Sequence, residues 1–144
     1  MIEILLKDIK PVSVNAAYAT ARNGGRFNTK KYSEFLRNFK IAMFPHNGLL
    51  TEFDRSFDHN KQEIMLEFTF YLPKKRYYTT QRKVSLRSGD ASNFIKTTED
   101  ALFKMLHTID DAQVKKVSSE KKVSHDNNFH IGIKIYTVLF EISA

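Results

Sequence analysis

Aspartates lie on both sides of a short amphipathic segment in the second half of the chain. Asp90 comes directly before the segment, and the pair Asp110-Asp111 follows it. Carboxylate oxygens are ligands that a hard divalent cation prefers, so convergence of these groups would create a metal site. A helix of about 15 residues is about 22 Å long, so Asp111 can approach Asp90 only if the chain runs back beside the start of the helix.

Each of these acids also has a simpler explanation in local structure. An aspartate before a helix accepts hydrogen bonds from unpaired amide groups, and Asp90, Ser92 and Asn93 could each take that cap position. Asp110 and Asp111 could be turn residues. The start of the helix would also attract a phosphate, because its amide groups and its dipole favour anions. Both explanations stay open at this point.

Lys96 lies on the polar face of the same segment, four residues before Asp100. One explanation is a helix pair with Asp100, worth a few tenths of a kcal/mol. The other is a cation beside a phosphate, where it would stabilise charge that develops on the phosphate oxygens. The spacing is compatible with both, so Lys96 is a candidate catalytic residue.

Residues 73–89, the basic connector, contain no acid and two adjacent tyrosines. Its cations are Lys74, Lys75, Arg76, Arg82, Lys83 and Arg87. Beside an acidic site these cations would hold a phosphodiester backbone, which carboxylates alone would repel. The alternative is a solvated basic loop in which Tyr77 and Tyr78 cover a sheet edge.

Hydrophobic periodicity predicts the elements that must position these residues. Alternating apolar residues predict four strands, over residues 2–9, 62–72, 113–123 and 128–142. Helical spacing predicts one helix that begins at Asn28 and another over 91–106. Residues 11–25 are rich in small side chains and predict a loop with a turn at Gly24-Gly25. We expect one α+β domain in which a mixed sheet of about four strands packs against two helices.

Composition narrows the class of protein. The 144 residues suffice for one domain, and the absence of cysteine excludes disulfides and zinc-thiolate sites. A net charge of +7 favours polyanionic partners. The five histidines lack zinc-binding spacing, and no nucleotide-binding glycine motif is present. No apolar run approaches the roughly 20 residues of a membrane span, and no signal peptide is evident, so we expect a cytoplasmic protein without a membrane partner.

Several short motifs occur in a fixed order along the chain. They are P-V-S-V-N at 11–15, D-A-S-N at 90–93, Lys96, D-A-L at 100–102 and D-D-A-Q-V at 110–114. This order resembles the RusA family of Holliday-junction resolvases, which are bacterial and prophage-borne endonucleases. The family pattern has a P-P-S-x-N loop, a D-x-D-N helix start, a lysine three residues later, D-A-L, and D-D-[AS]-Q-[VI]. The likeness extends over most of the chain, but only 89–114 carries specific motifs.

The resemblance implies roles for these residues. Asp90 and Asp111 would bind the metal, which would be Mg²⁺ with Mn²⁺ as a substitute, and Lys96 would be the essential catalytic cation. Supporting residues would be Asn93, Asp100 and Asp110. The resemblance also implies a homodimer with two sites across a basic channel, where the connector cations would bind DNA.

Ser92 stands where the commonest family pattern has its second aspartate. A serine hydroxyl or a water can complete the oxygen ligands of Mg²⁺, so Ser92 is a weak candidate ligand. Asp110 or Glu99 could replace the missing carboxylate. We expect metal binding to be weaker than with the full pattern.

We therefore expect residues 1–144 to form a RusA-like, Mg²⁺-dependent endonuclease that resolves Holliday junctions by paired nicking in recombination and repair. Four-way DNA has near two-fold symmetry, which suits a two-fold dimer. One alternative is a junction-binding protein that Ser92 leaves without catalysis. Another is a single-strand-binding module that uses Tyr77 and Tyr78 as stacking platforms.

Overall fold

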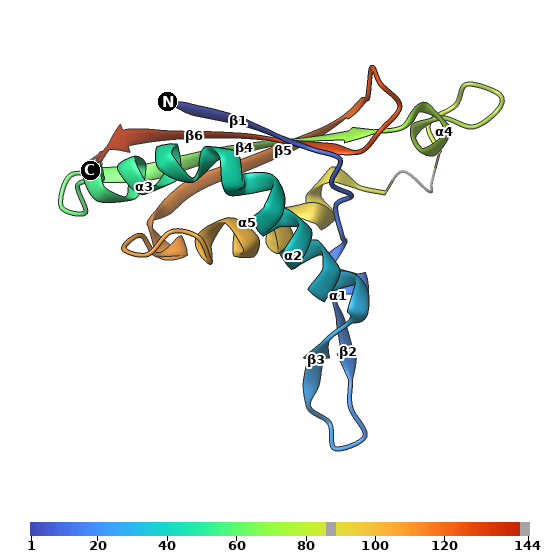
Figure 1. Cartoon of the computed structure of the whole chain (residues 1–144), viewed down its shortest axis with the longest axis horizontal. Coiled ribbons are helices and arrows are strands. Elements are labelled where there is room, and N and C mark those ends of the chain that lie inside the picture. Colours follow the sequence, from blue (N-terminus) through green and yellow to red (C-terminus); the bar gives the residue numbers. More distant parts are fainter. Residues whose placement is uncertain (86–88, 142–144) are drawn as a thin grey trace.

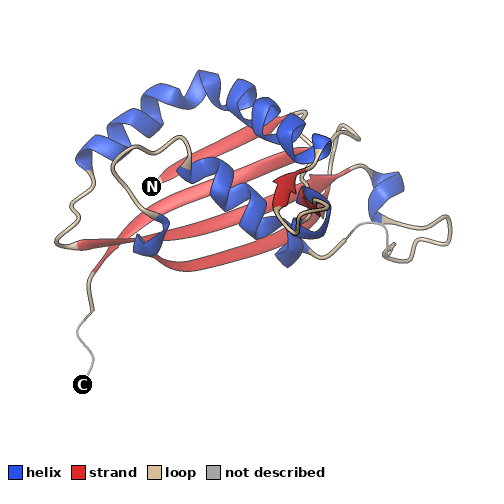
Figure 2. Ribbon diagram, turned by 90° about the horizontal axis from the view of Figure 1, so that it is seen from below, coloured by secondary structure: helices blue, strands red, loops and turns tan. Residues whose placement is uncertain are grey.

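The computed structural model describes residues 1–85 and 89–141. Its main sheet contains β1 (Ile2–Lys7), β4 (Gln62–Leu72), β5 (Val114–Val123) and β6 (His130–Leu139), in the order β1-β6-β4-β5. β4 and β5 run parallel, whereas β6 is antiparallel to both of its neighbours, β1 and β4. The longer helices lie on one face of this sheet (Figure 1, Figure 2). The α+β class and the mixed four-stranded sheet are confirmed.

The strict alternation of β4 explains which face the helices cover. Its buried side chains are Ile64, Leu66, Phe68, Phe70 and Leu72. On β6, the buried residues Ile131, Ile133 and Ile135 stand opposite three of them. Since alternate residues of a strand point to one face, the two strands present a continuous apolar surface. The strand predicted over 128–142 forms over 130–139, and residue 142 lies outside the described residues.

The helix predicted from Asn28 is α2 (Lys30–Met43), which begins after the cap residue Thr29. Its buried side chains, Tyr32, Phe35, Phe39 and Met43, occur at the predicted helical spacing. A short η1 (Phe44–His46) joins it to α3 (Asn47–Ser56), which the sequence does not predict. α3 lacks a side-chain cap and buries only Leu50 and Asp54, so no capping residue marks its start in the sequence.

The prediction of a loop over residues 11–25 is wrong in part. The chain there forms α1 (Val14–Ala17) and then a hairpin of β2 (Tyr18–Thr20) and β3 (Arg26–Asn28). Strands of three residues are too short to show a period of two, which explains the error. The turn at Gly24-Gly25 is confirmed, and Gly24 has a φ of 85°, a value that glycine adopts without strain.

The helix predicted over 91–106 consists of η3 (Ala91–Phe94) followed by α5 (Ile95–Phe103). It packs one face on the core, because Phe94, Ala101 and Leu102 are buried. Two further short elements are α4 (Lys74–Tyr77), in the basic connector, and η4 (Asp111–Gln113), before β5. Within the described residues, every helix is too short or too polar to cross a membrane.

Candidate functional site

Asp90 takes the cap position at the start of η3. Its Oδ1 accepts a hydrogen bond from the Ser92 amide at 3.1 Å, so the capping explanation is confirmed. Ser92 and Asn93 are exposed beside it. Gly89 precedes Asp90 with a φ of 78°, and its carbonyl accepts a hydrogen bond from Lys121 Nζ at 2.8 Å. Lys121 of β5 therefore fixes the backbone where η3 begins.

Lys96 of α5 forms the helix pair that its spacing allows. Its Nζ lies 3.0 Å from Asp100 Oδ1. The hydrogen bond to Asp100 raises the pKa of Lys96, and the charges of Asp100, Glu99 and Asp111 act in the same direction. Lys96 therefore stays a cation and lies within the electrostatic reach of Asp111, which is distant in sequence.

Glu99 lies on the same helix and is half-buried. Burial raises the pKa of Glu99, and the charges of Asp100 and Asp111 raise it further, whereas Lys96 lowers it. We call Lys96, Glu99, Asp100 and Asp111 the α5 cluster, because the charges of the two aspartates act on both Lys96 and Glu99. A cation that joined it would relieve this repulsion.

Asp110 and Asp111 open η4. Asp110 Oδ1 accepts a hydrogen bond from the Ala112 amide at 2.8 Å, and Gln113 Oε1 accepts one from the Asp110 amide at 3.3 Å. The Ala112 amide lowers the pKa of Asp110 below its ordinary value. This reciprocal capping satisfies free amides and holds Asp111 at a defined place in the first turn.

Asp54 of α3 holds the loop that leads to Asp110. This buried carboxylate accepts hydrogen bonds from the His107 amide at 3.2 Å, and from the Thr108 amide and hydroxyl at 3.1 and 3.0 Å. Burial would raise the pKa of Asp54, but these donors outweigh it and lower the pKa. Asp54 could not be predicted from the sequence, because its partners lie more than fifty residues away and no local spacing signals them.

Asp90 and Asp111 are anchored toward opposite ends of β5. The neighbour of Asp90 binds Lys121, whereas η4, which begins at Asp111, leads directly into Val114. The strand from Val114 to Lys121 is about 23 Å long. Across residues 1–85 and 89–141, no hydrogen bond or ion pair joins the two aspartates, and no three His, Cys, Asp or Glu side chains are grouped to hold a metal. The charge of Asp111 acts on Lys96 and Glu99, whereas Asp90 caps the start of η3.

The segment at 11–15 contacts the helix that carries Lys96. Thr97 Oγ1 donates a hydrogen bond to the Val12 carbonyl at 2.6 Å and is 3.2 Å from the Phe94 carbonyl. Ser13 caps α1, where its side chain accepts from the Ala16 amide. The two motif regions are therefore joined in space.

The basic connector presents its cations on two surfaces. A pocket of about 620 Å³ is lined by Lys74, Lys75, Tyr78, Thr79, Thr80, Arg82 and Ser85. Lys83 is exposed beside it, and Arg87 lies outside the described residues. Tyr77 and Tyr78 pack edge to face with ring centroids 4.8 Å apart, and Lys121 lies over the Tyr77 ring. Each tyrosine ring therefore has part of its surface covered by the other, and Lys121 covers a further part of the Tyr77 ring.

Arg76 faces a different cavity, of about 410 Å³, together with Lys10 and Lys31. These three residues come from the β1–α1 loop, α2 and α4, so the fold alone brings them together. Burial lowers the pKa of Lys10, and the positive charges of Arg76 and Lys31 lower it further. A phosphate would relieve this repulsion. Sequence analysis misses Lys10 and Lys31 because they lie outside the basic connector.

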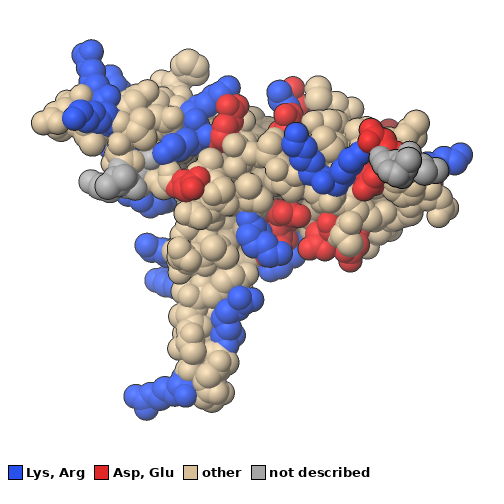
Figure 3. Space-filling model, turned by 180° about the vertical axis from the view of Figure 1, so that it is seen from behind, with Lys and Arg blue, Asp and Glu red and all other residues tan. Residues whose placement is uncertain are grey.

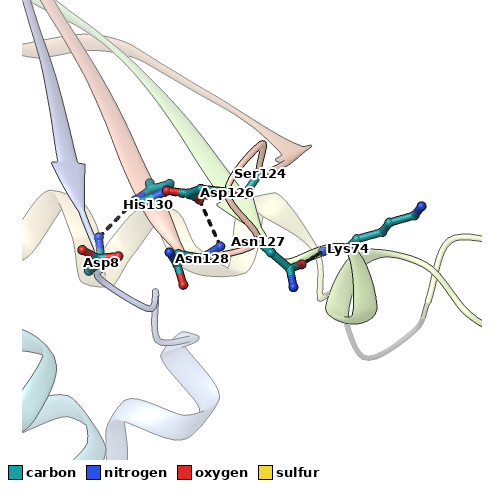
Figure 4. Close-up of polar contacts among 7 residues, drawn as sticks. All are labelled: Asp8, Lys74, Ser124, Asp126, Asn127, Asn128 and His130. Atoms are coloured by element: carbon teal, nitrogen blue, oxygen red, sulfur yellow. Dashed lines mark hydrogen bonds and ion pairs between the residues drawn. The ribbon is translucent and has the colours of Figure 1, made fainter.

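The turn between β5 and β6 anchors α4 (Figure 4). Asn127 Oδ1 accepts a hydrogen bond from the Lys74 amide at 2.9 Å. In the same turn, Asp126 accepts from Ser124 Oγ at 2.5 Å and pairs with His130 Nε2 at 2.7 Å. His130 Nδ1 accepts from the Asp8 amide at 3.0 Å, so Nε2 must carry the proton that it donates to Asp126.

Asp126→Asn is expected to lower the melting temperature most near neutral pH. Hydrogen bonds from Ser124 and His130 depress the pKa of Asp126 below its ordinary value of 3.8. Its contribution to stability is therefore present above that value and is lost as the pH falls toward the depressed one. Circular dichroism melts of the wild type and the variant across this range should converge in acid.

Asp8→Asn is the control for this prediction, because Asp8 binds His130 through its backbone amide and not through its side chain. A difference in melting temperature between wild type and Asp126→Asn that stays constant from neutral to acid pH would contradict the role of the Asp126 charge.

Charge is unevenly distributed over the face shown in Figure 3. Lysines and arginines stand on the connector end and the projecting hairpin, and on the main body acidic side chains are interspersed with further lysines and arginines. The basic connector end and hairpin are suited to hold a polyanion.

Comparison with known proteins identifies one family. A family model described as endodeoxyribonuclease RusA matches residues 8–136 of this chain. The match covers the N-terminal loop, the connector, the α5 cluster and most of the sheet. No curated protein matches the chain.

Proposed function

The chain belongs to the RusA endodeoxyribonuclease family, and from this premise we propose that it nicks Holliday junctions in a reaction that depends on a divalent metal. The observation that supports the proposal is the α5 cluster, in which Asp100 pairs with Lys96 at 3.0 Å and the charge of Asp111, from a distant segment, acts on Lys96 and Glu99. It lies on a body that carries basic surfaces on either side (Figure 3).

The donor groups of the α5 cluster fit a hard cation. All of its acids offer oxygen ligands, and the raised pKa of Glu99 reflects burial and negative charge that a cation would offset. Mg²⁺ keeps several waters and needs few protein ligands, so Asp111 and Glu99 would hold it, with Mn²⁺ as a substitute. Glu99 would take the place of the carboxylate that Ser92 lacks. When bound, Mg²⁺ neutralises phosphate charge and makes water more acidic.

The other residues of the chain have defined tasks in this proposal. Asp111 orients the attacking water toward the phosphorus, and Lys96 stabilises the charge that develops on the phosphate oxygens. Asp100 keeps Lys96 in place through the 3.0 Å ion pair. Asp90, with Ser92 as a weak ligand, would join the metal only if the start of η3 approached Asp111 when metal or DNA binds, and Asn93 and Asp110 would support the site.

DNA would bind across the basic surfaces. The exposed cations of the connector contact the DNA backbone, and the cavity of Lys10, Lys31 and Arg76 accepts one phosphate.

Two copies of the chain, related by a two-fold axis, would place two sites on a junction of the same symmetry and nick opposite strands. Sedimentation of the protein as a monomer at working concentration would count against paired nicking.

The expected result is symmetric nicking of a labelled synthetic four-way junction in Mg²⁺ or Mn²⁺ and none in EDTA. Linear duplex and single strand of the same sequence serve as controls, because a structure-specific enzyme leaves both intact. The products are separated on a denaturing gel, which locates each cut. Lys96→Ala should lower the rate about a hundred-fold, since it removes a cation from the developing charge.

Two results would oppose the proposal. Tight junction binding without cuts in either metal would indicate a protein that recognises junctions without cleaving them. Preference for the single strand over the junction would indicate a single-strand-binding module instead.

A further inference from the structure

The β2–β3 hairpin projects from the main body (Figure 1). Seven consecutive residues, 22–28, are exposed on it. A two-stranded hairpin has little core of its own and is marginally stable in isolation, so its ordered projection requires an anchor. We call residues 18–28 the arm.

The anchor lies at Thr29, where the arm meets α2. Thr29 Oγ1 donates a hydrogen bond to the Ala16 carbonyl at 2.6 Å, and the Thr29 amide donates to the Ala17 carbonyl at 2.9 Å. The rings of Tyr18 and Tyr32 pack edge to face with centroids 5.3 Å apart. These contacts fix the direction in which the arm leaves the body.

The tip of the arm is also held by hydrogen bonds. The Gly24 amide donates to the Ala21 carbonyl at 2.9 Å, and Asn23 Oδ1 accepts from the Gly25 amide at 3.0 Å. Anchored at both ends, the arm has the form of a preorganised β-ribbon. Such a ribbon loses little conformational entropy when it binds a partner.

The chemistry of the arm favours a polyanion. The sequence from Ile9 to Ser33 contains no acidic residue, and the arm carries Arg22 and Arg26. The Arg26 guanidinium lies 3.9 Å over the Tyr18 ring, and neither arginine forms an ion pair within the described residues. Figure 3 shows basic side chains and no acidic ones on the projecting hairpin.

The shape of the arm narrows the choice of polyanion. The major groove of duplex DNA admits a two-stranded β-ribbon. Phe27 is 51% exposed on the arm, opposite the small residue Ala19. An exposed phenylalanine next to Arg26 suits the apolar edges of bases or sugars, beside phosphates that the arginines hold.

The position of the arm connects it to the candidate site. A pocket of about 330 Å³ is lined at the base of the arm by Tyr18, Asn28, Tyr32, Asp100, Phe103 and Lys104. Asp100 belongs to the α5 cluster, and its charge contributes to the raised pKa of Tyr32, behind burial and the hydrogen bond to Tyr18. A duplex that reached the α5 cluster could therefore continue along the arm.

We infer that the arm binds one duplex limb of the branched substrate, with Arg22 and Arg26 on backbone phosphates and Phe27 against the groove. This inference rests on the proposed function and adds a contact surface that extends beyond the connector. The arm holds the limb while the α5 cluster acts on the strand at the branch.

The chain contains no tryptophan, so Phe27→Trp places a single indole on the arm. Its fluorescence should change on addition of a synthetic four-way junction in EDTA and saturate at the stoichiometry of binding. The control is Phe44→Trp, at a phenylalanine that is 75% exposed beyond the far end of α2. A fluorescence change in Phe27→Trp no larger than that in Phe44→Trp would overturn the inference.

The double variant Arg22→Ala/Arg26→Ala tests the charges. Its affinity for the junction should fall about ten-fold, and the slope of log affinity against log salt should become shallower by about 2, one for each lost phosphate contact. The matched control is Arg37→Ala/Lys40→Ala, which removes two cations from α2. That control should bind within about two-fold of wild type.

The outcomes separate this inference from the proposed function. Wild-type affinity in the arm variant, with a normal circular dichroism spectrum, would refute the arm as a DNA contact even if nicking is normal. A change from dimer to monomer in the arm variant would also refute it and assign the arm to contact between copies of the chain. Failure of the wild type to nick any junction, while the indole of Phe27→Trp still responds to duplex DNA, would refute the proposed function alone.

Discussion

Asp111→Asn should reduce metal-dependent nicking of a four-way junction about a thousand-fold while leaving junction affinity within about two-fold of wild type. The substitution keeps the shape of the side chain and removes the charge that acts on Lys96 and Glu99. Asparagine is a weaker ligand for Mg²⁺ and a poor base, so both proposed tasks of Asp111 are lost. Single-turnover nicking rates and binding in EDTA measure the two effects separately.

Glu120→Gln is the matched control for this prediction. Glu120 is an acid on β5 that pairs with Lys122 at 3.4 Å, away from the α5 cluster. The Glu120→Gln variant loses one negative charge, as Asp111→Asn does, and should nick junctions at the wild-type rate. If both variants were equally slow, or if Asp111→Asn nicked at the wild-type rate, Asp111 would not be the catalytic carboxylate.

The variant Asp90→Asn tests whether Asp90, which lies apart from Asp111, binds metal or only caps η3. Asparagine caps helices as well as aspartate does, so η3 should form in the variant. As a metal ligand, Asp90 would be as sensitive to this change as Asp111, and we expect activity to be lost. Retention of activity would limit Asp90 to capping and leave Glu99 and Asp111 as the metal-binding pair.

Asp54→Ala should lower the free energy of unfolding by about 2 kcal/mol, because it removes the charged acceptor of the part-buried hydrogen bonds from His107 and Thr108. The loop that these donors hold leads to Asp111, so nicking should also slow. Urea denaturation gives the first quantity, and nicking rates under strongly native conditions give the second.

The control for this prediction is Glu52→Ala, which removes an exposed acid from the same helix and should change stability by less than about 0.5 kcal/mol.

The loss of stability in Asp54→Ala should depend on pH. Because the folded pKa of Asp54 lies below its ordinary value of 3.8, its contribution is present above that value and is lost in acid. Equal stability of Asp54→Ala and wild type at neutral pH would show that the hydrogen bonds contribute nothing net.

Much of the fold could be predicted from periodicity. The alternation of β4 and the helical stripes of α2 and α5 place their apolar residues on one face, and burial in the structure follows those patterns. The short elements could not be predicted, since three-residue strands such as β2 and β3 show too little of their period. α3 lacks a cap and buries a carboxylate, Asp54, where its pattern would otherwise be apolar.

The sequence by itself determined the chemical types at the candidate site and the local contacts within one or two turns. The Asp90 cap and the Lys96–Asp100 pair follow from spacing alone, because residues a few positions apart must meet in a helix. Only the tertiary structure decided which distant groups share a site. It placed Asp111 where its charge acts on Lys96 and Glu99, left Asp90 at the start of η3, and assembled Lys10, Lys31 and Arg76 around one cavity. Such groupings depend on sheet order and helix packing, which are set by burial of the whole core and have no counterpart in local spacing.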